Sequence, residues 1–197
     1  MGNNKKAMKI NPEKKEIYNY SDYITWSDDV RYELLDGVQY AIAAPLPIHQ
    51  DICRELALII GNFLKGKSCK LYFAPFDVRL NADTTDDDVV QPDLVVICDL
   101  SKLDKRSYKG SPDIVIEITS PSTAHIDRFN KFQKYLQAKV PEYWIVEPES
   151  RIVSVFTLDK DRYITNVYSE TDKIMSSVLD GCVVDLSEVF SSIDIKF

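Results

Sequence analysis

The fold of this chain is decided by residues 91–144, which contain the segments QPDLVVI (91–97), DIVIEIT (113–119) and DRFNKFQKYL (127–136). The first two segments are typical of short apolar strands, and each carries one carboxylate, Asp93 or Glu117. The third is typical of an amphipathic helix and carries Lys131. A carboxylate inside a run of Val and Ile is costly to bury unless another group compensates its charge. We expect a divalent metal ion to provide that compensation.

The same stretch predicts a strand–helix–strand unit. Side chains of the strand 113–119 alternate between two faces, so Glu117 points away from the face that carries the isoleucines. The helix is expected over 127–139, stops before Pro141, and is followed by an apolar strand at 143–146. A crossover of this length implies a parallel, right-handed βαβ unit. The buried stripe of the helix is predicted to consist of Phe129, Phe132 and Leu136.

The flanking segments add further strands and one long helix. The Asp-Gly pair at 36–37 predicts a hairpin, and a helix is expected from His49 onward. The acidic segment 81–90 is typical of a solvated loop. Two segments at 152–156 and 163–168 predict an antiparallel hairpin near the C-terminus.

The chain therefore has the pattern of one α/β domain. We expect a mixed central β-sheet flanked by helices, with a C-terminal β-hairpin, over residues 20–197. Residues 1–19 are polar and rich in Lys and Asn, which predicts a flexible N-terminal arm. At 197 residues the chain is long enough to bury a core of ordinary size.

Composition indicates a soluble, cytoplasmic protein. The net charge of −7 argues against a protein that coats nucleic acid nonspecifically, because such binding depends on neutralising phosphates. No apolar run approaches the roughly 20 residues of a membrane helix, and no apolar region of a secretory signal follows the N-terminus, so no membrane partner is expected. The cysteines form no CxxC pair, and we expect all four to be reduced: Cys53, Cys69, Cys98 and Cys182.

The two core carboxylates suit a hard cation. If the strands of Asp93 and Glu117 lie side by side, both carboxylates can reach one Mg²⁺ or Mn²⁺ ion, with the backbone carbonyl of Ile118 as a third ligand. Lys131 can reach the same strand end, where a lysine beside a metal-bound water can orient it or offset charge on a phosphate. These parts suit hydrolysis of a phosphodiester bond. The alternative is structural: a core carboxylate and a solvated helix lysine.

A second Pro-Asp pair, Pro112-Asp113, is not expected to hold the metal. Asp113 lies on the same strand as Glu117 and four residues away, which is about 13 Å. That distance is too long for both carboxylates to bind one magnesium ion.

The chain resembles the Uma-type family of restriction endonucleases within the PD-(D/E)XK nuclease superfamily. The resemblance covers nearly everything from Tyr32 to Phe190. It is carried by YELLDG (32–37), His49, QPD (91–93), IEITSPST (116–123), Asp127 with Lys131 and Tyr135, and VPEYWIV (140–146). Each landmark is weak alone, whereas their order and spacing together are specific.

The resemblance implies a restriction-endonuclease-like fold and assigns the site residues. Asp93 matches the aspartate of the "PD" element, and Glu117 matches the "(D/E)" position. The strict pattern has lysine two residues later, where this chain has Thr119. Similar families carry the lysine on the following helix, which implicates Lys131, with Lys134 as a weaker substitute.

Two further residues enter through the same resemblance. Glu33 matches an acidic residue that can add to the metal site, although composition alone favours an exposed strand position. His49 is expected to line the same cleft, with a structural or capping role as the alternative.

Three functions follow in order of preference. The first is a Mg²⁺- or Mn²⁺-dependent DNA endonuclease that uses the site above. The second is a noncatalytic nucleic-acid-binding or regulatory module that retains the fold. The third is sugar hydrolysis by the paired carboxylates, in which the lysine has no special role. Isologous pairing is the commonest assembly, and an enzyme that cuts both strands gains from two sites, so the sequence is compatible with a homodimer.

Overall fold

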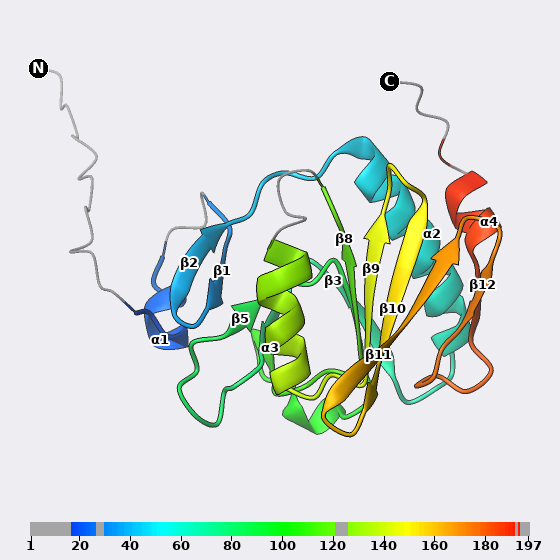
Figure 1. Cartoon of the computed structure of the whole chain (residues 1–197). Coiled ribbons are helices and arrows are strands. Elements are labelled where there is room, and N and C mark those ends of the chain that lie inside the picture. Colours follow the sequence, from blue (N-terminus) through cyan, green and yellow to red (C-terminus); the bar gives the residue numbers. More distant parts are fainter. Residues whose placement is uncertain (1–16, 27–29, 121–125, 192, 194–197) are drawn as a thin grey trace, which may run out of the picture.

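The computed structural model describes residues 17–26, 30–120, 126–191 and 193, with the side chains of 126–128 excepted (Figure 1). The α-helices are α1 (Tyr20–Tyr23), α2 (Pro47–Leu64), α3 (Phe132–Gln137) and α4 (Leu186–Ser191). A 3₁₀ turn, η1 (Leu100–Lys102), and a π-helix, η2 (Ile126–Lys131), complete the helical segments. The predicted arm at 1–19 lies almost entirely outside the described residues and stays a prediction.

Within the described residues the strands form three sheets. The central sheet contains, in spatial order, β11 (Arg162–Ser169), β10 (Ile152–Asp159), β9 (Glu142–Glu147), β8 (Ile114–Ile118), β6 (Leu94–Ile97) and β3 (Lys70–Phe73). The second sheet contains β2 (Val38–Ala41), β1 (Tyr32–Leu35), β5 (Val89–Val90), β4 (Asp77–Arg79) and β7 (Ser107–Lys109). The third is the pair β12 (Lys173–Met175) and β13 (Val183–Asp185).

The central sheet is mixed, as predicted. β8 and β9 run parallel across the helical connection, with Ile116 opposite Trp144, whereas β6 pairs with β8 antiparallel, with Leu94 opposite Ile116. β10 and β11 form the predicted antiparallel hairpin. This arrangement places the start of β6 beside the end of β8, so the segments that carry the two core carboxylates are neighbours.

The two faces of the central sheet are covered by different helices (Figure 1). The isoleucines of β8 pack in one core cluster with side chains of α2 and α4, including Ile52 and Leu56. Val115, on the opposite face of β8, packs in a second cluster with Tyr135 of α3. The predicted alternation is therefore confirmed, and Glu117 lies on the α3 side.

The segment 81–90 is not a solvated loop throughout, which corrects the prediction. Its last residues form β5, and Asp88 is only 6% exposed. The Asp88 carboxylate accepts a hydrogen bond from the backbone N–H of Asp36 (2.8 Å) and pairs with Lys134. The acidic composition hid this strand because the partners that compensate Asp88 lie far away in sequence.

The predicted stripe of the helix is also wrong. Phe129 is 60% exposed, and Phe132 and Leu136 are only partly buried. The helix instead buries polar side chains: Lys131, Lys134 and Tyr135. Turns of a π-helix are wider than those of an α-helix, so three- and four-residue spacing does not follow one face through η2. Moreover, carboxylates on the facing elements compensate the two lysines.

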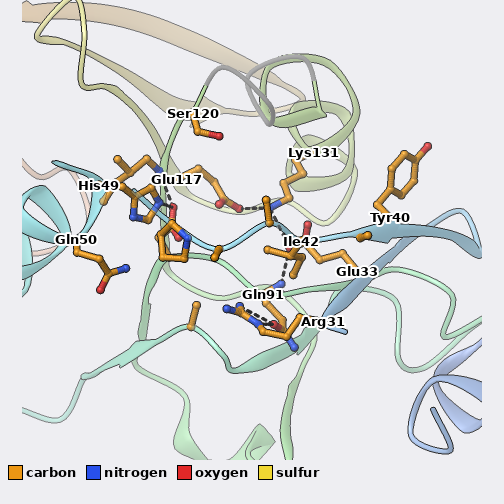
Figure 2. A pocket seen from close by; sticks show the side chains of 17 residues that line it. Arg31, Glu33, Tyr40, Ile42, His49, Gln50, Gln91, Glu117, Ser120 and Lys131 are labelled. Atoms are coloured by element: carbon orange, nitrogen blue, oxygen red, sulfur yellow. Dashed lines mark hydrogen bonds and ion pairs between the residues drawn. The ribbon is translucent and has the colours of Figure 1, made fainter. Parts of the chain in front are cut away.

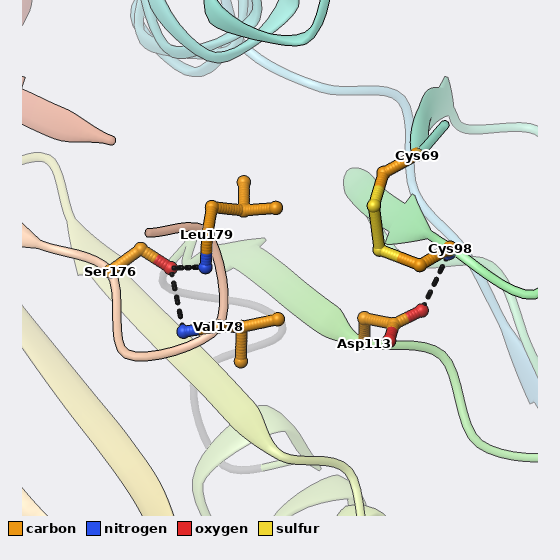
Figure 3. Close-up of a disulfide and its surroundings, with 6 residues drawn as sticks. All are labelled: Cys69, Cys98, Asp113, Ser176, Val178 and Leu179. Carbon is orange, nitrogen blue, oxygen red and sulfur yellow. Dashed lines mark hydrogen bonds between the residues drawn. A yellow bond between two sulfur atoms is a disulfide. The ribbon is translucent and has the colours of Figure 1, made fainter. Parts of the chain in front are cut away.

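Two of the four cysteines are paired, which corrects the expectation that all are reduced. Cys69 and Cys98 form a disulfide, whereas Cys53 and Cys182 are free (Figure 3). Antiparallel pairing of β3 with β6 sets Lys70 opposite Ile97, so the next residues outward are the two cysteines. Their separation of 29 residues concealed this neighbourhood in the sequence.

None of the helices in the described ranges has the length and apolar character required to cross a membrane.

Candidate active site

The candidate site is a cleft of about 110 Å³ between the two larger sheets (Figure 2). It is bordered by β1, β2, the N-terminal end of α2, the segment before β6, the end of β8 and η2. The polar side chains that line it are Arg31, Glu33, Tyr40, His49, Gln50, Gln91, Asp93, Glu117, Ser120 and Lys131. All five residues predicted to be catalytic are therefore brought to one cavity.

Lys131 joins two carboxylates at the floor of this cleft. Its Nζ lies 2.9 Å from Oε1 of Glu117 and 2.9 Å from Oε1 of Glu33. All three side chains are almost fully buried, which excludes the exposed strand position for Glu33. Buried carboxylates accept a neighbouring ammonium group as their compensation because water cannot screen their charge.

Tyr135 completes the environment of Glu117. Its hydroxyl donates a 2.6 Å hydrogen bond to the same Oε1 atom that contacts Lys131. The pKa of Tyr135 is raised well above its usual value by burial, and the charges of Glu117 and Glu33 raise it further. The phenol therefore stays protonated and acts as a fixed donor to the carboxylate.

Asp93 lies beside the end of β8 and is held by two donors. His49 Nε2 is 3.0 Å from Oδ2 of Asp93, and the backbone N–H of Ile118 donates to the same oxygen at 2.8 Å. The His49 side chain is buried, and its Nδ1 atom has no hydrogen-bond partner among the described residues. Burial, together with the negative charge of Asp93, raises the pKa of the nearby Cys53 thiol to about 11. That thiol is therefore protonated and inert at neutral pH.

Gln91 and Arg31 are site residues that the sequence did not suggest. The backbone N–H of Gln91 donates to Oε1 of Glu33 at 2.7 Å. Its side-chain carbonyl accepts from Nε and Nη2 of Arg31 at 3.0 and 2.8 Å. Their positions in the sequence could have indicated them. Gln91 directly precedes the Pro-Asp element, and Arg31 lies two residues before Glu33, which places it on the same side of the strand.

Two candidate lysine positions lie away from the cleft. The Thr119 hydroxyl donates to the carbonyl of Val146, so this residue faces β9. Lys134, the weaker substitute, pairs with Asp36 and Asp88 outside the cleft. The side chain of Asp127, a landmark of the family resemblance, lies outside the described part of the structure.

Asp113 is a structural carboxylate, in agreement with its rejection as a ligand. Its Oδ2 atom accepts the backbone N–H of Cys98 at 2.6 Å, at the end of β8 remote from the cleft (Figure 3). The two Pro-Asp pairs of the chain therefore occupy opposite ends of the same two strands.

The donor set of the cleft fits a hard divalent ion. Asp93 and Glu117 offer carboxylate oxygens, the donors that Mg²⁺ and Mn²⁺ prefer. Within the described ranges no group of three or more His, Cys, Asp or Glu side chains is arranged to hold a metal ion. Asp93 and Glu117 would be the two carboxylates, a number that Mg²⁺ usually takes while it keeps several waters. A carbonyl ligand at Ile118 stays a prediction.

Comparison with known proteins assigns the family. The model of the Uma2 family, described as "Putative restriction endonuclease", matches residues 20–187. The chain belongs to the Uma2 family. An uncharacterized protein of Synechocystis is 27% identical to this Uma2 chain over 158 residues, which are 78% of this chain and 81% of that protein.

A solved structure supports the same fold. The crystal structure of a protein from Anabaena variabilis, described as a "putative nuclease belonging to DUF820", superimposes with a TM-score of 0.68 at 17% identity. The match covers 82% of this Uma2 chain and 90% of the Anabaena protein. The restriction-endonuclease-like architecture expected from the sequence is thereby confirmed.

Proposed function

We propose that this chain is a metal-dependent nuclease that hydrolyses phosphodiester bonds in DNA. The observation that supports this most directly is the position of Lys131, 2.9 Å from Glu117 in a cleft that Asp93 also lines. A lysine carried by the helix after the acidic strand replaces the one missing at Thr119. Membership of a family described as restriction endonucleases supports the same activity.

In this proposal Asp93, Glu117 and the carbonyl of Ile118 hold Mg²⁺ or Mn²⁺, which supplies Lewis-acid activation of water and of the phosphate. His49 keeps the Asp93 carboxylate oriented through its 3.0 Å contact. Lys131 offsets the negative charge that develops on the phosphate as the water attacks.

Glu33 has a positioning role in the same proposal. It holds Lys131 from the side opposite Glu117 and is itself held by the backbone of Gln91. The ammonium group is therefore preorganised between two carboxylates.

The two Pro-Asp pairs provide a matched test. Plasmid and single-stranded DNA are incubated with wild type, Asp93→Asn and Asp113→Asn in Mg²⁺, in Mn²⁺ and in EDTA. We expect metal-dependent cleavage by wild type and Asp113→Asn, and a loss of at least about 100-fold in Asp93→Asn. Cleavage in EDTA, or equal rates for both variants, would contradict the proposal.

A noncatalytic nucleic-acid-binding module is the second candidate. The carboxylates of Glu33 and Glu117 are already paired with Lys131, so their burial does not by itself require a metal ion. DNA binding without cleavage in either metal would support this function. A homodimer would allow a nuclease to cut both strands, and sedimentation of the DNA complex tests that assembly.

A further inference from the structure

A second cavity of about 440 Å³ adjoins the cleft and has a different chemistry. It shares Arg31 and Gln91 with the cleft, so the two cavities meet at these side chains. The rest of its lining is mostly aromatic or apolar: Tyr20, Tyr23, Ile24, Trp26, Val30, Tyr32, Pro75 and Phe76, with Asp77 and Arg106 as the charged members. None of the five predicted catalytic residues belongs to it.

The aromatic wall is built around Trp26. Its ring lies 5.1 Å from Tyr18, 5.5 Å from Tyr23 and 5.5 Å from Tyr32, at interplanar angles of 86°, 60° and 79°. These edge-to-face contacts hold the indole firmly while its side chain remains only partly buried. A half-buried, braced aromatic ring is suited to stacking with a flat ligand.

The polar side of the cavity is rigid. The amide group of Gln91 donates to the hydroxyl of Tyr23 and to Oδ1 of Asp77, each at 2.9 Å, and accepts from Arg31. Asp77, whose Oδ1 also accepts from the Tyr23 hydroxyl at 2.9 Å, is therefore a fixed carboxylate in the lining of the cavity.

The rim of the cavity is basic. Arg106 is exposed and makes no side-chain ion pair within the described ranges, and Arg31 stands at the junction with the cleft. Cationic side chains at the rim, aromatic rings in the wall and a fixed acceptor inside match a nucleotide: a phosphate outside and a base within.

We propose that the second cavity binds an unpaired nucleobase of the strand whose phosphates lie in the catalytic cleft. The preferred substrate class is then single-stranded or locally unpaired nucleic acid, since a base within a duplex cannot reach Trp26. This inference rests on the proposed nuclease function and extends it. Gln91 connects the base cavity with the catalytic cleft, because its side chain lines the base cavity while its backbone holds Glu33.

The test measures binding in EDTA, where no cleavage occurs. The probes are a single-stranded oligothymidine, the same backbone with abasic sites, and a blunt duplex. The variants are Trp26→Leu, the conservative Trp26→Tyr, and Phe73→Leu, which removes an exposed aromatic ring outside both cavities. We expect Trp26→Leu to weaken oligothymidine binding by roughly 5- to 150-fold, the range that loss of one stacked base implies. Binding of the abasic strand and the duplex should not change, and Trp26→Tyr should restore most of the affinity.

Intrinsic fluorescence reports the contact directly. The chain has two tryptophans, and Trp144 is 1% exposed in the core, so quenching by oligothymidine should come from Trp26 and vanish in Trp26→Tyr. Arg106→Gln is the second variant, because an exposed side chain can be replaced without risk to the fold. Arg106→Gln should lower the affinity for every probe. It should also reduce the slope of log affinity against log salt concentration by about one phosphate contact.

The outcomes separate this inference from the nuclease proposal. If Trp26→Leu loses equal affinity for oligothymidine and for the abasic strand, the proposed base-binding role of the cavity is rejected, even if wild type cleaves DNA. Unchanged tryptophan fluorescence on binding of oligothymidine would reject it as well. Base-dependent binding with no cleavage in Mg²⁺ or Mn²⁺ would support the cavity and reject the nuclease.

Discussion

Lys131 and Lys134 lie about one helical turn apart, and each is buried between two carboxylates. Lys131 contacts Glu33 and Glu117, whose side chains are 6% and 4% exposed. Lys134 contacts Asp88 and Asp36, whose side chains are 9% and 80% exposed. The first cluster lines the cleft, whereas the second lies outside it.

The comparison sets an ion cluster that lines the cleft beside a similar cluster that lies outside it. Both lysines bring a carboxylate of the β1–β2 hairpin to the helix, so both contribute to packing of the two larger sheets. Only the Lys131 cluster shares a cavity with Asp93 and His49. A buried acid–lysine–acid arrangement alone is therefore insufficient to indicate catalysis, and only Lys131 also lines the cleft of the proposed function.

Removal of each lysine should produce the largest effects. In Lys131→Met, Glu33 and Glu117 lose their compensation, and we expect the free energy of unfolding to fall by about 3–5 kcal/mol. The free energy of unfolding should fall less in Lys134→Met, because water reaches Asp36 and screens its charge. Urea unfolding measures both, and cleavage per folded molecule should be lost only in Lys131→Met. Loss of cleavage in folded Lys134→Met would contradict the separation of roles.

Substitution of one acidic partner in each cluster tests whether the two clusters also differ in their effect on the cleavage rate. Glu117→Gln keeps size and hydrogen bonding but removes the charge, and we expect cleavage to fall by about 10²–10³-fold. Asp88→Asn is the matched control and should keep the wild-type rate per folded molecule. Single-turnover assays at saturating Mg²⁺ compare the two. Full activity in Glu117→Gln would show that this carboxylate is structural.

Two tyrosine hydroxyls allow a finer test of the comparison, with smaller expected effects. The Tyr135 hydroxyl donates to Glu117, and the Tyr163 hydroxyl donates to the backbone carbonyl of Val140 at 2.9 Å. Each change to Phe should cost about 0.5–1.5 kcal/mol of unfolding free energy, the usual net value of one hydrogen bond. Only Tyr135→Phe should also slow cleavage. An equal effect of both variants on the rate would remove the positioning role of Tyr135.

The smallest expected effect is on pH dependence. Burial lowers the pKa of Lys134, but hydrogen bonds to Asp36 and Asp88 outweigh it, so this pKa is raised above the ordinary 10.5. A lysine whose pKa is raised on folding contributes stability that is fully present below 10.5 and is lost as the pH rises through the folded-state value.

Urea unfolding of wild type and Lys134→Met at pH 8 and pH 11 checks this sign. The difference in unfolding free energy between the two proteins should shrink at the higher pH. A difference that stays constant or grows would mean that the Lys134 cluster does not depend on the charge of the lysine.

The sequence by itself determined β6, β8 and β9, the alternating faces of β8 and the two core carboxylates, because period-two patterning and the cost of burying charge are local properties. Resemblance to a family added His49 and Glu33 and strengthened the assignment of Lys131. Tertiary structure alone decided the pairing of Cys69 with Cys98 and the burial of Asp88. It also decided that the helix turns its lysines inward. Lys134 and Asp36 are 98 residues apart, and no periodicity can indicate that a charge will find its partner at that distance. The base cavity arises for the same reason: its walls come from four separated segments that only the folded sheets bring together.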